Sequence, residues 1–179
     1  MTRFLPRALR RFARREEGHA TIEFALVFPA MLFLLLSGVE LGMISLQHSM
    51  LERAMDQTVR DIRLSTGAAP QHDEIKDLLC ERTGYISDCS DSMLLEMVQV
   101  DPRAWSAVSA NATCVDKSEE VQPKTIFKND AKENELMILR ACAKVDPVFP
   151  TTWLGANLVK DGAGQFAITA MSAFVQEPR

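Results

Sequence analysis

Four cysteines are the residues whose type and spacing most directly predict chemistry in this chain of 179 residues: Cys80, Cys89, Cys114 and Cys142. All four follow the apolar stretch at 24–39, and an even number of thiols confined to one part of the chain favours disulfides formed in an oxidising compartment. Three pairings are possible. We favour Cys80 with Cys89, a short clip, and Cys114 with Cys142, which would close a long polar loop. A zinc site is the competing interpretation, but there is no Cys-x-x-Cys pair and no cluster of histidines.

The other reactive side chains do not form a recognisable catalytic or cofactor site. His19, His48 and His72 lie in separate segments without an obvious serine or cysteine partner, and no glycine-rich phosphate-binding loop is present. The acidic pair Glu119-Glu120 lies in a charged stretch that we expect to face solvent. We therefore predict no catalytic residue, no cofactor and no metal, and the acidic C-terminal part argues against nucleic-acid binding.

Charge is distributed unevenly along the chain. Residues 1–17 contain six arginines and two glutamates, a net charge of +4. Residues 18–50 contain only two charged side chains, Glu23 and Glu40. Residues 51–179 contain 14 Lys and Arg against 20 Asp and Glu, a net charge of −6. A composition of 47% hydrophobic and 25% charged residues excludes a disordered chain and a polytopic membrane protein. A basic leader, an apolar segment and an acidic remainder are typical of a membrane-targeted chain.

The apolar segment predicts one transmembrane helix. Residues 24–39 carry no charge and would span about 24 Å as a helix, and extension to residue 44 gives about 31 Å, enough for the hydrocarbon core of a bilayer. The extension encloses Glu40, whose carboxylate we expect to reach toward the interface. The arginine cluster places the amino terminus in the cytoplasm and the residues after about 45 outside it. A buried globular helix, a mitochondrial presequence and a cleaved secretory signal fit the flanking residues less well.

The boundary between the leader and the apolar segment combines a glycine, a carboxylate and an aromatic ring in the string GHATIEF at 18–24. Glu23 lies one turn into an otherwise apolar helix, where an unpaired carboxylate is costly. Such a carboxylate could pair with an ammonium group of a neighbouring subunit and so select the register of the two helices. The alternative is a Glu23 that is merely solvated by lipid headgroups.

This boundary resembles the type III signal of type IV prepilins and pseudopilins, and the longer string GHATIEFALVFP resembles the TadE-like family of tight-adherence (Flp) pilus systems. The resemblance covers roughly residues 18–60. It implies that a prepilin peptidase cuts after Gly18, that His19 becomes the new amino terminus, and that Glu23 and Phe24 act in subunit assembly. It also implies a single-pass inner-membrane protein whose partners are the peptidase, other pilin and pseudopilin subunits and the pilus assembly platform. His19 departs from the phenylalanine that pilins usually carry at this position.

The elements that position these residues begin with the apolar helix itself. Between residues 43 and 66 no glycine or proline interrupts the chain, and small or apolar residues recur with a period close to 3.6. We expect the helix to run over residues 20–65, with a kink at Pro29 and a stop at Gly67. Its apolar stripe favours docking against the C-terminal part of the same chain over contact with other subunits.

The remainder of the chain predicts a small α+β domain. A short helix is expected at 73–82. Strands are expected at 94–100, 136–145 and 165–175, where branched and apolar residues predominate. Loops are expected at 116–134 and 146–164. The predicted fold class is therefore α+β, a long N-terminal helix followed by a small antiparallel sheet, which is a pilin-like arrangement.

These expectations divide the chain into a cytoplasmic leader at 1–18 with a cleavage site, a helix at 19–66 and a disulfide-bonded periplasmic head at 67–179. The leading hypothesis is a TadE-like pseudopilin of the bacterial inner membrane with a non-enzymatic role in pilus assembly. The alternative from another class is a signal-anchored periplasmic binding module with an uncleaved anchor. A membrane-bound enzyme is the third and weakest hypothesis.

Overall fold

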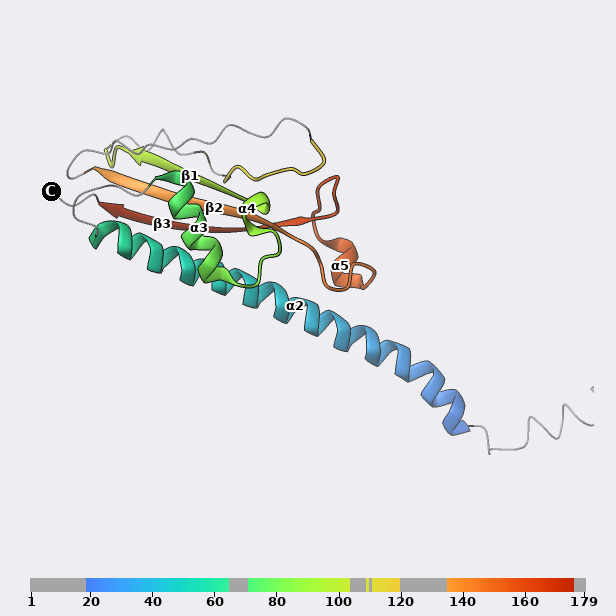
Figure 1. The fold of residues 1–179 in the computed structure, drawn as a ribbon. Coiled ribbons are helices and arrows are strands. Elements are labelled where there is room, and N and C mark those ends of the chain that lie inside the picture. The colour runs from blue at the N-terminus through green and yellow to red at the C-terminus, as the bar shows by residue number, and fades with distance from the viewer. Residues whose placement is uncertain (1–18, 65–70, 104–108, 110, 120–134, 176–179) are drawn as a thin grey trace, which may run out of the picture.

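The computed structural model describes residues 19–64, 71–103, 109, 111–119 and 135–175. Its dominant element is α2, a helix of 46 residues over His19–Leu64 that continues through Pro29. The C-terminal half of α2 lies along the sheet, whereas the N-terminal half projects away from it (Figure 1). The predicted long helix is confirmed, and its expected stop at Gly67 lies outside the described residues.

Three antiparallel strands form one sheet in the order β1–β2–β3. The strands are β1 over Met93–Val100, β2 over Leu136–Val145 and β3 over Phe166–Val175. Each begins within one residue of its predicted start. Branched and apolar residues at successive positions favour strands because they pack well on a pleated surface. The predicted α+β class is confirmed.

A second helix, α3 over His72–Thr83, packs beside α2. It ends at Gly84, whose φ of 60° lies in the left-handed region that glycine adopts at little cost. Arg82 joins the two helices, because its guanidinium donates a hydrogen bond to Thr58 at 3.2 Å and forms an ion pair with Asp61. The helix predicted at 73–82 is therefore confirmed and is one residue longer at each end.

The hydrophobic core lies between the helices and one face of the sheet. The buried residues of the C-terminal half of α2 are Leu51, Ala54, Met55, Thr58, Val59 and Ile62. They recur at the spacing that places side chains on one face of a helix. From the sheet, Leu95, Met137 and Leu139 are fully buried in the same cluster. Docking of the α2 stripe on the chain's own head, the favoured interpretation, is confirmed.

Both of the favoured disulfides are present. Cys80 of α3 is bonded to Cys89, the first residue of the short helix α4 (Cys89–Ser92), and their α-carbons lie 5.6 Å apart. Cys114 is bonded to Cys142 of β2, with the α-carbons 5.2 Å apart. The first bond closes the turn between α3 and α4, and the second ties the coil around Cys114 to the sheet. All four sulfur atoms are therefore engaged in disulfides and none is available as a thiolate ligand for zinc.

The prediction of an uninterrupted loop at 146–164 is wrong, because this segment contains a short helix, α5, over Trp153–Asn157. Thr152 caps it by accepting the Gly155 N–H at 3.2 Å. A β-carbon at Gly155 would lie 2.2 Å from the Phe149 carbonyl oxygen, so only glycine fits at this close approach. Five residues are too few for apolar periodicity to reveal a helix in the sequence.

Candidate functional site: the exposed helix and its junction with the head

The N-terminal half of α2 exposes an apolar surface that the rest of the described chain does not cover. Every residue from 20 to 35 is exposed, including Leu26 at 72% and Leu34 at 76%. Among the described residues, α2 is the one helix long and apolar enough to cross a membrane, and its most apolar window has no buried residue. A core helix of a soluble protein would be mostly buried. The segment 24–39, here named the apolar span, thus needs lipid or other helices to cover it.

The residues predicted to act in processing and assembly lie at and just before the N-terminal end of the apolar span. Helix α2 begins at His19, and Gly18 lies outside the described residues. Glu23 follows His19 by four positions, which places the two residues on the same face of the helix, one turn apart. Phe24 is 63% exposed, and its ring stacks on that of Phe28 with centroids 4.8 Å apart. Cleavage after Gly18 stays a prediction.

Glu40, the first fully buried residue of α2, directly follows the other end of the apolar span. Its carboxylate accepts two backbone hydrogen bonds from the head, one from the Val148 N–H at 3.0 Å and one from the Phe149 N–H at 2.6 Å. We expected this carboxylate to reach toward the membrane interface; in the structure, two N–H donors of the head satisfy it inside the protein. Glu40 therefore joins the head to the helix at the point where the apolar span ends.

The segment bound by Glu40 is itself held in a tight turn. The Phe149 carbonyl accepts two hydrogen bonds from Thr152, one from its hydroxyl at 2.9 Å and one from its N–H at 3.2 Å. The same hydroxyl caps α5 through Gly155. A continuous series of contacts thus leads from Glu40 through the turn to α5, and α5 packs against α2 beside the end of the apolar span.

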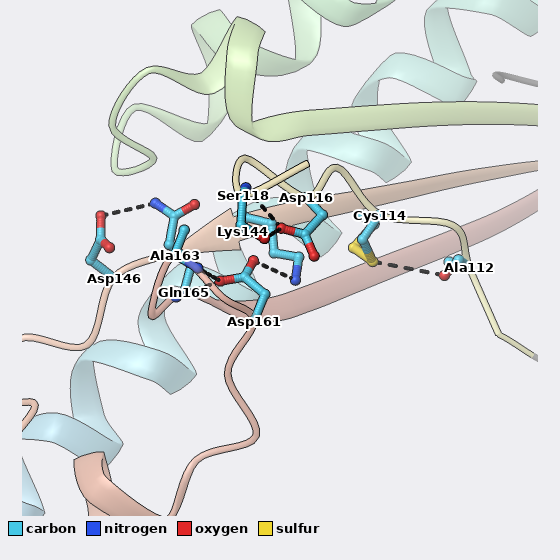
Figure 2. A network of polar contacts seen from close by, with 10 residues as sticks. Ala112, Cys114, Asp116, Ser118, Lys144, Asp146, Asp161, Ala163 and Gln165 are labelled. Carbon is cyan, nitrogen blue, oxygen red and sulfur yellow. Dashed lines mark hydrogen bonds and ion pairs between the residues drawn. A yellow bond between two sulfur atoms is a disulfide. The ribbon is translucent and has the colours of Figure 1, made fainter. Parts of the chain in front are cut away.

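A polar network anchors the chain between α5 and β3 (Figure 2). Asp161 forms a nearly buried ion pair with Lys144 of β2 at 2.8 Å, and its other oxygen accepts the N–H groups of Ala163 at 3.1 Å and Gln165 at 2.9 Å. Burial alone raises the pKa of Asp161, but Lys144 and the two N–H groups outweigh burial, so the pKa lies below its ordinary value. The Gln165 amide also donates to Asp146 at 3.1 Å, which holds together the two ends of the connection between β2 and β3.

Sequence reasoning identified the cysteines and the apolar span but missed the role of Glu40. The sequence offered one signal for this role, a single carboxylate directly after an apolar run. Its partners could not be found because they lie 108 and 109 residues further along the chain. Within the part of the chain that the structure describes, no group of three or more His, Cys, Asp or Glu side chains is arranged to hold a metal ion.

Comparison with known families bears on this same region. The family model described as TadE-like protein matches residues 18–60. These residues, here named the TadE-like region, are similar to that family. The TadE-like region begins at the predicted cleavage boundary, includes the apolar span and Glu40, and ends within the stripe of α2 that docks on the head. Comparisons with curated proteins and with solved structures give no match.

Proposed function

We propose that this protein is a TadE-like pseudopilin, a minor pilin that helps to assemble tight-adherence (Flp) pili and has a structural rather than an enzymatic role. The observation that carries this proposal is the TadE-like region at 18–60, in which an exposed apolar span continues without a break into a helix docked on the head. Such a helix presents one half to lipid or to other helices while its other half holds the head in place.

In the precursor, the apolar span crosses the bacterial inner membrane once. The six arginines of the leader keep the amino terminus in the cytoplasm, so the head faces the periplasm. The two disulfides support this orientation, because the bacterial periplasm is oxidising whereas the cytosol keeps thiols reduced.

A prepilin peptidase then removes residues 1–18, and His19 carries the new terminal ammonium. Glu23 lies one turn further along the same face of α2, and its carboxylate enters the apolar zone, where a charge is costly. The ammonium of an adjacent subunit balances this charge when the two helices are in the correct axial register. The exposed Phe24, which stacks on Phe28, packs against the neighbouring helix at the same level.

The partners that follow from this proposal are the inner membrane, the prepilin peptidase, other pilin and pseudopilin subunits and the pilus assembly platform. Gly38 and Gly42 support contact with other helices, because a β-carbon at either position would meet nothing within 4 Å. The charged face of α2 at 52–63 is exposed on the side away from the core, which leaves it available to subunits or to the platform.

Processing provides the test of the proposal. The full-length protein is co-expressed with its cognate peptidase, extracted from membranes and measured by intact mass. The wild type should lose residues 1–18, Gly18→Leu should remain uncut, and the control Gly38→Leu, a glycine in the same helix with open space around it, should be cut normally. Normal processing of Gly18→Leu would remove the prepilin-type signal, and a wild type that keeps its leader would favour the signal-anchored binding module.

A further inference from the structure

The segment of the head beside the end of the apolar span has an unusual surface. Residues 147–159 contain no charged side chain, although 25% of the chain is charged. Three large apolar residues of this segment are exposed, Val148 at 46%, Trp153 at 75% and Val159 at 92%. The segment, here named the tryptophan segment, is therefore an uncharged surface with exposed apolar side chains on an otherwise acidic domain.

Glu40 determines how far the tryptophan segment lies from the start of the apolar span. Glu40 follows Glu23 by seventeen positions, which corresponds to about 26 Å of helix, close to the ~30 Å of a hydrocarbon core. When Glu23 lies at the cytoplasmic boundary of that core, Glu40 therefore lies at the opposite boundary. The N–H groups of Val148 and Phe149 are bound to the Glu40 carboxylate, so this part of the tryptophan segment lies at the same level, and α5 packs against α2. In Figure 1, α5 is at the end of the head from which the apolar span projects.

We propose that the tryptophan segment rests on the periplasmic leaflet of the bilayer, with the Trp153 ring in the headgroup region. Tryptophan favours this zone because its ring is largely apolar and its N–H needs a polar partner. The bilayer is the partner that the geometry favours, since Glu40 ties the segment to the helix where the helix leaves the membrane. This contact holds the head in one orientation against the membrane. The inference rests on the proposed single-pass span.

The test uses the full-length protein in phospholipid nanodiscs, where both membrane faces are accessible. Trp105→Phe leaves Trp153 as the single tryptophan. Bromine atoms near the headgroup end of the lipid chains should quench Trp153 fluorescence. The control is a chain that lacks both native tryptophans and carries Val175→Trp. Aqueous iodide should quench Trp153 several-fold less than it quenches the tryptophan of this control. Val175 is 46% exposed at the end of β3 remote from the apolar span.

A third variant separates this inference from the proposed function. Phe33→Trp, also without the native tryptophans, places the probe in the middle of the apolar span, where deeply brominated lipid should quench it. In one outcome, brominated lipid quenches Phe33→Trp but not Trp153, and iodide quenches Trp153 fully. This outcome would overturn the membrane contact of the tryptophan segment and leave the membrane span intact. Shielding of Trp153 from iodide without lipid quenching would assign the surface to a second copy or another protein and would also overturn it. Absence of lipid quenching in Phe33→Trp would overturn both the span and the contact.

Discussion

Glu96 of β1 and Arg140 of β2 lie directly opposite each other in the sheet, and the Arg140 Nη2 is 2.7 Å from the Glu96 Oε2. Both side chains are almost completely buried, at 2% and 7% exposure. They lie on the face of the sheet away from α2, because neighbouring residues of β2 alternate between the faces. Arg140 also donates to the Ser109 carbonyl at 2.8 Å. One buried ion pair thus joins two strands to the coil that leads to Cys114.

Removal of one member of this pair should destabilise the head strongly. Arg140→Leu leaves the Glu96 carboxylate buried without its countercharge, and we expect the free energy of unfolding to fall by about 3–5 kcal/mol. Urea unfolding of the detergent-solubilised protein, followed by circular dichroism, measures the loss. The double variant Glu96→Leu/Arg140→Leu removes both charges and should be more stable than the single variant. A single variant as stable as the wild type would contradict this role of the pair.

The junction at Glu40 gives a second prediction. Glu40→Gln retains one acceptor oxygen but turns an amide N–H₂ toward a backbone donor, so one of the two hydrogen bonds is lost. We expect a cost of about 1–3 kcal/mol and faster hydrogen exchange at the Val148 and Phe149 amides, measured by mass spectrometry.

The same substitution at Glu23 is the matched control for the junction, because Glu23 is an exposed glutamate on the same helix. Glu23→Gln should leave exchange at Val148 and Phe149 unchanged. Equal protection of these amides in Glu40→Gln and the wild type would show that the carboxylate does not hold the turn.

The pH dependence of stability should contain a contribution from Asp161. Its pKa is lower in the folded protein than its ordinary value of 3.8, so the ionised form is stabilised by folding. This stabilisation is fully present above the unfolded pKa and is lost as the pH falls through the folded pKa. Asp161→Asn should lower stability at pH 7 by about 1–3 kcal/mol and flatten its decline below about pH 4. Urea unfolding at a series of pH values measures both effects, and a profile of Asp161→Asn identical to that of the wild type would contradict this contribution.

Glu23→Gln should separate processing from assembly. The carboxylate lies five residues beyond the predicted cut, so we expect normal insertion and normal cleavage. Loss of the negative charge leaves the His19 ammonium of the neighbouring subunit less well compensated in an apolar zone, and few or no surface pili should form. Electron microscopy and crosslinking to pilin partners measure assembly, and the control Glu81→Gln, at an exposed glutamate of α3 in the head, should assemble normally. If Glu23→Gln forms as many pili as the wild type, Glu23 is only an interfacial residue and has no role in assembly.

The sequence by itself determined the features that depend on local pattern. The run without charge at 24–39 and the apolar stripe that ends near Ile62 predicted α2, and the branched and apolar residues at 94–100, 136–145 and 165–175 predicted the strands. Each of these patterns involves residues that are close together in the sequence. The even cysteine count and the short separation of Cys80 from Cys89 similarly favoured the disulfide pairing that the structure contains.

Only the tertiary structure decided which partners the polar residues have. Glu40 looked like a membrane-boundary carboxylate, yet it binds the backbone of Val148 and Phe149, whose N–H groups carry no sequence signature. Arg140 found its partner Glu96 through the strand register, which depends on how the whole sheet packs against the helices. Hydrogen bonds and ion pairs form between groups that are close in space, and a linear sequence encodes that distance only through the complete fold.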